Sequence, residues 1–181
     1  MKKNTNIIKL EFITMFFSMI LGSLLHFTYN WSGNNTFVGI FSAINESTWE
    51  HLKILFFPIL LTIIIGYIYS KKDIENYICY KTKSLLLSLS FIVVFFYTYN
   101  GVLGGNIILL DISSFYVAIL LGEYYTIKQI KKNCPCNKNI YMFVLILLSI
   151  SFIIYTFYTP SLGIFKDPVT STYGIYKKKY K

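Results

Sequence analysis

Two carboxylates and a histidine lie close together in the chain, at Glu46, Glu50 and His51. Glu46 and Glu50 are four residues apart, so they share one face if a helix already covers both positions. His51 follows Glu50 directly, which turns it about 100° around such a helix, so the spacing does not require one site for all three. Carboxylate oxygens and imidazole nitrogens bind divalent cations and also act as general acids and bases.

Further polar residues lie at the ends of long apolar segments. His26 and Asn30 end the first such segment, and Asp111 lies early in the fourth. Ionisable groups within a bilayer cost about 2.5–3.5 kcal/mol each on insertion scales, so they normally face a cavity or a partner. The predicted polar cluster comprises His26, Asn30, Asn45, Glu46, Glu50, His51 and Asp111. The candidate ligands of a divalent cation within it are His26, Glu46, Glu50 and Asp111.

Ordinary structural roles would also account for several of these residues. Ser47 and Glu50 have the spacing of a capping box, which makes Ser47 the predicted N-cap of the helix that follows. Glu50 and Lys53 have the spacing of an ion pair within a helix. His26 is typical of an interfacial histidine bonded to a neighbour, and Asp111 is compatible with a charge pair. The sequence leaves both kinds of role open for these positions.

The elements that must position these residues are membrane helices. Apolar residues form 55% of the chain and charged residues only 14%, against about 25% in soluble domains. Apolar segments of about 20 residues are long enough to cross a bilayer. We predict an all-α integral membrane protein, a single bundle over residues 1–160 with an irregular tail over 161–181. The five predicted spans cover residues 7–29, 48–69, 84–100, 106–128 and 140–158. Residues 37–44 are too few to span and are predicted to be re-entrant or interfacial.

Lysine residues indicate the orientation of this bundle. The net charge of +9 comes from 17 lysines without a single arginine, and the lysines cluster next to the apolar segments rather than on one folded face. We therefore expect no nucleic-acid partner and a bilayer environment instead. The positive-inside rule predicts a multi-pass plasma-membrane protein with a cytoplasmic N-terminus and an external C-terminus. The cysteines would then face the reducing cytoplasm, so we expect free thiols rather than a disulfide.

Three pieces of the chain together resemble a family of small bacterial multi-pass membrane proteins that is known only as a domain of unknown function. The resemblance covers nearly the whole length and implies an integral membrane protein, without supplying an activity or a site. The pieces are His26 with residues 29–33, the N-E-S-T-W-E-H-L-K motif at 45–53 with the Val38–Gly39 pair before it, and the F-K-D-P-V-T motif at 165–170 with the Tyr173–Gly174 pair after it.

Three functions are compatible with these observations. The first is transport or binding of a cation or small solute in an outward-facing polar cavity. The second is a membrane-embedded, metal-dependent hydrolase or transferase acting on a lipid-like substrate, with a carboxylate as general base. The third is an accessory subunit whose polar cluster is structural. The sequence does not decide whether the protein is an enzyme, which cofactor beyond a divalent cation it would use, or its oligomeric state.

Overall fold

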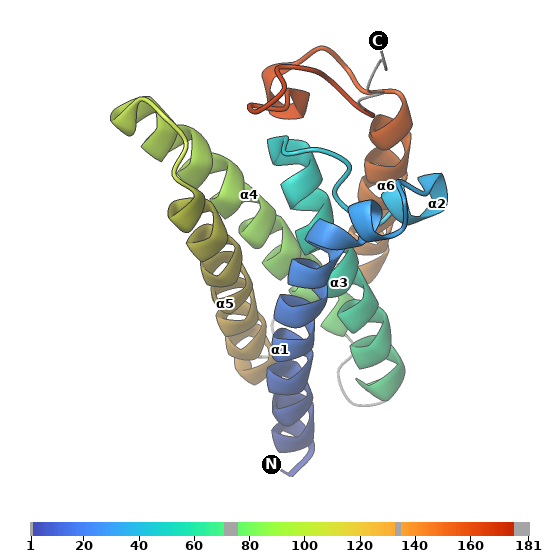
Figure 1. Ribbon diagram of the computed structural model, residues 1–181. Coiled ribbons are helices and arrows are strands. Elements are labelled where there is room, and N and C mark those ends of the chain that lie inside the picture. Colours follow the sequence, from blue (N-terminus) through green and yellow to red (C-terminus); the bar gives the residue numbers. More distant parts are fainter. Residues whose placement is uncertain (1, 71–75, 133–134, 176–181) are drawn as a thin grey trace.

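A computed structural model describes residues 2–70, 76–132 and 135–175, and within these ranges the chain is helical without a strand. Five of the helices are long and apolar enough to cross a bilayer, which confirms the predicted all-α bundle of a multi-pass membrane protein. The N-terminal end of the chain and the C-terminal tail lie at opposite ends of this bundle (Figure 1). The helices are α1 (Lys2–Trp31), α2 (Thr36–Gly39), α3 (Thr48–Ser70), α4 (Tyr77–Leu103), α5 (Ile108–Lys132) and α6 (Lys138–Phe157), followed by the 3₁₀ turn η1 (Gly163–Phe165).

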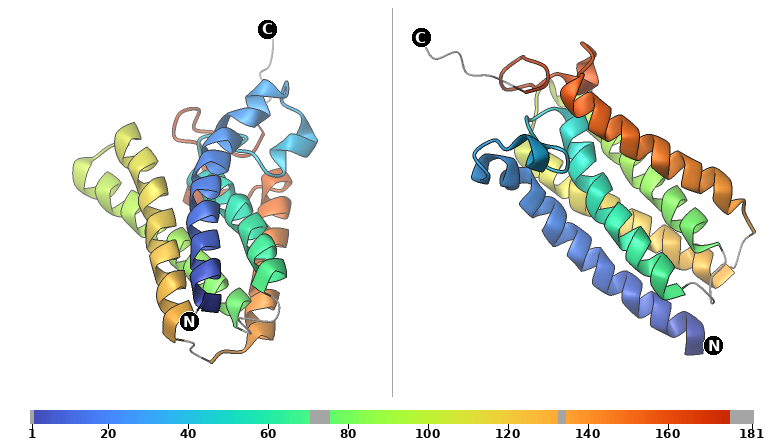
Figure 2. Two further views of the ribbon diagram at one scale, coloured as in Figure 1. Left: turned by 90° about the horizontal axis from the view of Figure 1, so that it is seen from below. Right: turned by 90° about the vertical axis from the view of Figure 1, so that its right-hand side faces the viewer.

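The central helix of the bundle is α3, which packs against α1, α4 and α6. In its most apolar stretch 56% of residues are buried, against 17–33% in the other four spanning helices. Its large side chains Leu55, Phe56 and Ile59 form the core with Leu85 of α4 and Phe152 of α6. The outer helices keep many large apolar side chains exposed, as expected of surfaces in contact with lipid. We call the end of the bundle that holds α2 and η1 the tail end (Figure 2).

The opposite end of the bundle is closed by a buried ionic network. Lys81 Nζ lies 2.8 Å from Glu11 Oε2 and 2.5 Å from Glu123 Oε1, and the Tyr77 hydroxyl donates a 2.7 Å hydrogen bond to Glu11. Glu11 and Glu123 are both at least 94% buried in their side chains. The pairing of Lys81 with both carboxylates offsets the cost of removing them from water. The same packing explains why α4 begins at Tyr77, ahead of the predicted span at residue 84.

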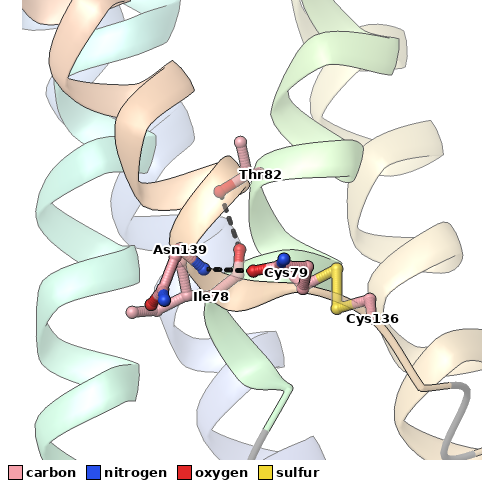
Figure 3. Close-up of a disulfide and its surroundings, with 6 residues drawn as sticks. Ile78, Cys79, Thr82, Cys136 and Asn139 are labelled. Atoms are coloured by element: carbon pink, nitrogen blue, oxygen red, sulfur yellow. Dashed lines mark hydrogen bonds between the residues drawn. A yellow bond between two sulfur atoms is a disulfide. The ribbon is translucent and has the colours of Figure 1, made fainter.

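A disulfide joins Cys79, near the start of α4, to Cys136, just before α6 (Figure 3). The two Cα atoms are 6.6 Å apart. This finding corrects the expectation that the cysteines are free thiols, which rested on the predicted orientation and not on the distance between them. The cross-link ties the start of α6 to the start of α4. The two cysteines are 57 positions apart in the sequence, so it connects distant parts of the chain.

Candidate metal centre

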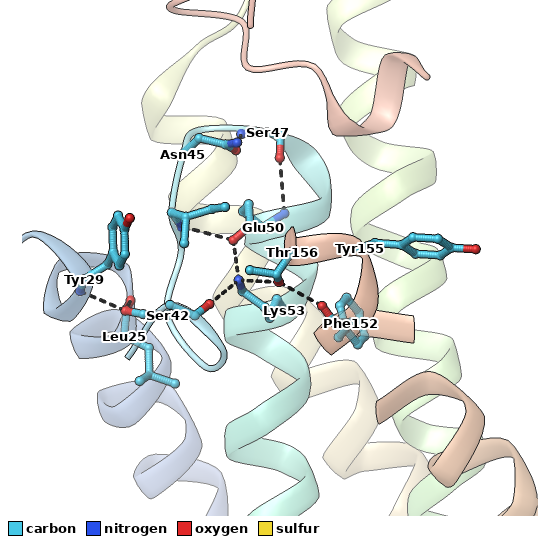
Figure 4. Close-up of polar contacts among 12 residues, drawn as sticks. Leu25, Tyr29, Ser42, Asn45, Ser47, Glu50, Lys53, Phe152, Tyr155 and Thr156 are labelled. Carbon is cyan, nitrogen blue, oxygen red and sulfur yellow. Dashed lines mark hydrogen bonds and ion pairs between the residues drawn. The ribbon is translucent and has the colours of Figure 1, made fainter. Parts of the chain in front are cut away.

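A buried ion pair in the first turns of α3 holds the preceding segment in place. Glu50 Oε2 lies 2.5 Å from Lys53 Nζ, and neither side chain is more than 3% exposed. Glu50 also accepts a 3.0 Å hydrogen bond from the backbone N–H of Ile44. Lys53 donates to the Gly39 carbonyl at 2.8 Å and to the Thr156 hydroxyl at 3.0 Å (Figure 4). The pair therefore joins α3 both to the segment before it and to α6.

Asn45 and Ser47 shape the turn that leads into α3. Asn45 Oδ1 accepts a hydrogen bond from the Ser47 N–H at 2.9 Å, while Asn45 Nδ2 donates to the Gly174 carbonyl in the tail at 3.0 Å. Ser47 Oγ accepts from the Glu50 N–H at 3.4 Å, the contact of an N-cap residue (Figure 4). The reciprocal half of a capping box is replaced, because the Glu50 carboxylate binds the backbone of Ile44 instead.

This turn brings Glu46 between two histidines from different helices. His26 Nε2, from α1, lies 3.7 Å from Glu46 Oε1, and His51 Nε2, from α3, lies 3.6 Å from Glu46 Oε2. The two imidazole centroids are 5.3 Å apart. All three side chains are half-buried, with 27%, 48% and 33% exposed for His26, Glu46 and His51. Each carboxylate oxygen of Glu46 thus faces one ring nitrogen.

The spacing of these atoms suits a metal ion better than direct hydrogen bonds. An N–H···O hydrogen bond spans about 2.7–3.2 Å, which is shorter than both nitrogen–oxygen distances here. Two ligands about 2.0 Å from a tetrahedral zinc ion are separated by roughly 3.3 Å. One ligand atom from each of the three residues lies within 4.8 Å of the others. To bind one ion, the three atoms would have to move closer together than they are here.

A backbone contact orients the His51 ring for such a role. His51 Nδ1 lies 2.9 Å from the Ser47 carbonyl oxygen. A carbonyl can only accept, so Nδ1 carries the proton and donates, which leaves the Nε2 lone pair directed at the cluster. Metal-binding histidines commonly have this arrangement, in which the second ring nitrogen donates to a carbonyl or carboxylate.

The structure brings together only part of the predicted ligand set. Among the residues described, the one group of three potential ligands is His26, Glu46 and His51, so His51 takes the position proposed for Glu50. The reason is local: α3 begins at Thr48, so Glu46 precedes the helix and the four-residue spacing does not place it on the face of Glu50. Glu50 points to Lys53 instead.

Asp111 and Asn30 lie outside the three-residue group. Asp111 is in the first turn of α5, where the Tyr99 hydroxyl donates a hydrogen bond to its carboxylate. Asn106 Oδ1 lies 2.9 Å from the same hydroxyl. Asn30 is exposed near the end of α1. Asp111 nevertheless lines the same cavity as the two histidines.

The cluster opens onto a cavity of about 650 Å³ at the tail end. Its polar lining includes the three clustered residues together with Asp111 and Asn106. Ser23 and Tyr116 also line it and join α1 to α5, with their hydroxyl oxygens 3.0 Å apart. Sequence reasoning missed this pair, because nothing in the spacing of single hydroxyl residues shows which faces of two distant helices meet.

Comparison with known proteins identifies the family but not an activity. The family of unknown function DUF6512 matches residues 1–175, and the chain belongs to this family. The resemblance to an uncharacterised family is therefore confirmed. No curated protein matches the chain. No solved structure matches it either.

Proposed function

We propose that this membrane protein binds one divalent transition metal, with Zn²⁺ the best fit, through His26 Nε2, His51 Nε2 and the Glu46 carboxylate. The observation that carries the proposal is the convergence of these ligand atoms within 4.8 Å, from two helices and one loop. Two histidines and one glutamate form one of the established zinc ligand sets. Nitrogen ligands favour zinc over calcium or magnesium, which prefer sites built from oxygen alone.

Binding is favoured over passage of the ion across the bilayer. Below the cluster the bundle is filled by apolar side chains, among them Phe56, Ile59 and Leu89. A hydrated cation would lose most of its water among these side chains, and the cost of such desolvation is large. The described core is therefore suited to hold a metal at one end of the bundle, rather than to conduct it.

A metal-dependent hydrolase is the second candidate, and one feature favours it. Three protein ligands would leave a fourth position for water on a bound zinc, and all three residues line the cavity. Catalytic zinc sites have this composition, whereas structural zinc sites usually have four protein ligands. Zinc lowers the pKa of a bound water to about 7, which makes hydroxide available at neutral pH.

We also propose that the chain lies in the plasma membrane with the tail end outside. Lysines in residues 71–83 and 128–138 support a cytoplasmic position for the opposite end. The Cys79–Cys136 disulfide counts against this orientation, because disulfides persist mainly on oxidising sides of membranes. A topology reporter fused after Lys181 decides between an external and a cytoplasmic tail end. With the proposed orientation, a reporter that works only outside the cytoplasm should be active.

Metal analysis of the purified protein tests the proposed site. Wild-type protein should contain one zinc per chain, and Co²⁺ in its place should give the visible absorption of a tetrahedral site. His26→Ala and Glu46→Ala should each lose the metal, while remaining monodisperse by gel filtration. Asp111→Asn is the matched control, because Asp111 lines the same cavity outside the ligand group. Retention of zinc in both alanine variants, or a metal-free wild type after incubation with zinc, would overturn the proposal.

A further inference from the structure

We infer that the cavity beside the cluster binds a single-chain, lipid-like amphiphile. Its apolar chain would lie among the apolar side chains of α1, α4 and α5, and its anionic oxygen head group would bind at the metal. This inference rests on the proposed metal site for its polar end, whereas the chain-binding wall stands on separate residues.

The cavity has a polar cluster at one end, and most of the remaining wall is apolar, although Ser23, Asn106, Asp111, Ser114 and Tyr116 also line it. His26, Glu46 and His51 line the polar end. The apolar wall is formed by Phe27 of α1, Ile92 and Phe96 of α4, and Ile108, Ile112 and Phe115 of α5. A volume of about 650 Å³ lies within the usual range for small-molecule sites, which is about 300–1,000 Å³. A ligand that satisfies both ends must itself have a polar head and an apolar body.

The apolar wall belongs to membrane-spanning helices and is not sealed by protein. At the tail end the α4–α5 hairpin leans away from α1 and α3 (Figure 1). Phe27, Ile108 and Ile112 keep 49%, 74% and 52% of their surface exposed. Because lipid surrounds these helices, an acyl chain can reach the wall without entering water. A soluble ion or sugar would gain nothing from this surface.

The C-terminal tail borders the cavity at the tail end. Pro168 and Val169 contribute to the lining. Their turn is held by Asp167, whose Oδ1 accepts hydrogen bonds from the N–H groups of Val169 at 2.7 Å and Thr170 at 3.2 Å. Trp49 packs on Phe165 with ring centroids 4.8 Å apart, which anchors the tail to α3. The tail therefore has a fixed position at the edge of the cavity, while the apolar wall belongs to the spanning helices.

Photo-crosslinking in lipid nanodiscs tests the inference. The probe is a long-chain carboxylate with a diazirine in its chain, added to zinc-loaded protein, and labelled peptides are mapped by mass spectrometry. Labelling should concentrate on residues 92–96 and 108–115. Ile112→Trp should reduce it about tenfold by filling the cavity. Leu120→Trp should leave it unchanged, because Leu120 is on the same helix, is 48% exposed, and does not line the cavity.

Changes in the head group and the metal test the polar end. The same chain with a trimethylammonium head should label the cavity at least tenfold less, and so should the carboxylate with Glu46→Ala. A chain with a phosphate head shows whether phosphate replaces carboxylate; labelling by either anion supports the inference. Zinc binding with equal labelling of Ile112→Trp and Leu120→Trp would overturn the inference and leave the metal proposal standing. Equal labelling of wild type and Glu46→Ala would overturn the head-group assignment. Failure of the wild-type protein to bind zinc would overturn the proposed function.

Discussion

Glu46 and Glu50 are four residues apart, yet they lie in opposite surroundings. Glu50 is 98% buried, paired with Lys53 and hydrogen-bonded to backbone. Glu46 is half exposed and lies between His26 and His51 at distances too long for hydrogen bonds. Every oxygen contact of Glu50 serves to hold chain segments together. The carboxylate of Glu46 lies between two imidazoles at the edge of a cavity, where a ligand can reach it.

The contrast teaches that burial alone does not mark a functional carboxylate in this bundle. Glu11 and Glu123 repeat the pattern of Glu50, because both are buried against Lys81. Buried ion pairs of this kind contribute when complete and are costly when broken. Among these four glutamates, the structural ones are therefore those with a lysine partner, and the candidate ligand is the one with histidine neighbours.

The largest expected effect comes from breaking the Glu50–Lys53 pair. Lys53→Met should destabilise the protein by about 3–5 kcal/mol, because it leaves a buried carboxylate without its cation. Thermal and denaturant unfolding in detergent measure the change. Adding Glu50→Gln to Lys53→Met should recover part of the loss, since the remaining group is neutral. If Lys53→Met unfolds like wild type, the pair does not anchor the segment before α3.

The second-largest effect should be stabilisation by zinc, which should depend on Glu46. At a free zinc concentration of 100 times Kd, wild-type stability should rise by about 2.7 kcal/mol, as expected for a ligand that binds only the folded state. Glu46→Gln should lose this gain. Without metal, the same variant should differ from wild type by less than about 0.5 kcal/mol, because its side chain is half exposed. Equal stabilisation of both proteins would show that zinc binds elsewhere.

The smallest effect should come from the turn between the two carboxylates. Ser47→Ala should cost about 1 kcal/mol, the usual value for an N-cap residue whose side chain accepts a hydrogen bond. Ser47→Thr keeps that acceptor and should stay close to wild type in the same unfolding measurement. Zinc stoichiometry should be unchanged, because the Ser47 carbonyl, not its hydroxyl, contacts His51. Loss of zinc in Ser47→Ala would mean that the cap also determines the ligand geometry.

Much of the fold follows from local properties that the sequence displays directly. Long apolar segments predict helices, since a backbone in lipid must satisfy its own hydrogen bonds. The five spans confirm this reasoning, and the segment between the first two forms only the four-residue α2. Asp111, predicted early in the fourth span, lies on the wall of the same cavity as His26 and His51.

Other features depended on contacts between distant segments. The early start of α4 follows from packing of Tyr77 and Lys81 against α1 and α5, which no local pattern shows. The Cys79–Cys136 disulfide required the approach of two segments 57 residues apart. The candidate site contains His51 and not the predicted Glu50, because α3 begins only at Thr48.

The sequence by itself determined the class of this protein and the region of its candidate site. Hydropathy and the motif at residues 45–53 suffice for both, because apolar length and local residue type act within one segment. Only the tertiary structure decided which side chains meet. Glu50 is buried because it forms an ion pair with Lys53. The turn at Asn45 instead leaves Glu46 facing His26 of another helix. Such choices depend on long-range partners, and their positions exist only once the helices have packed.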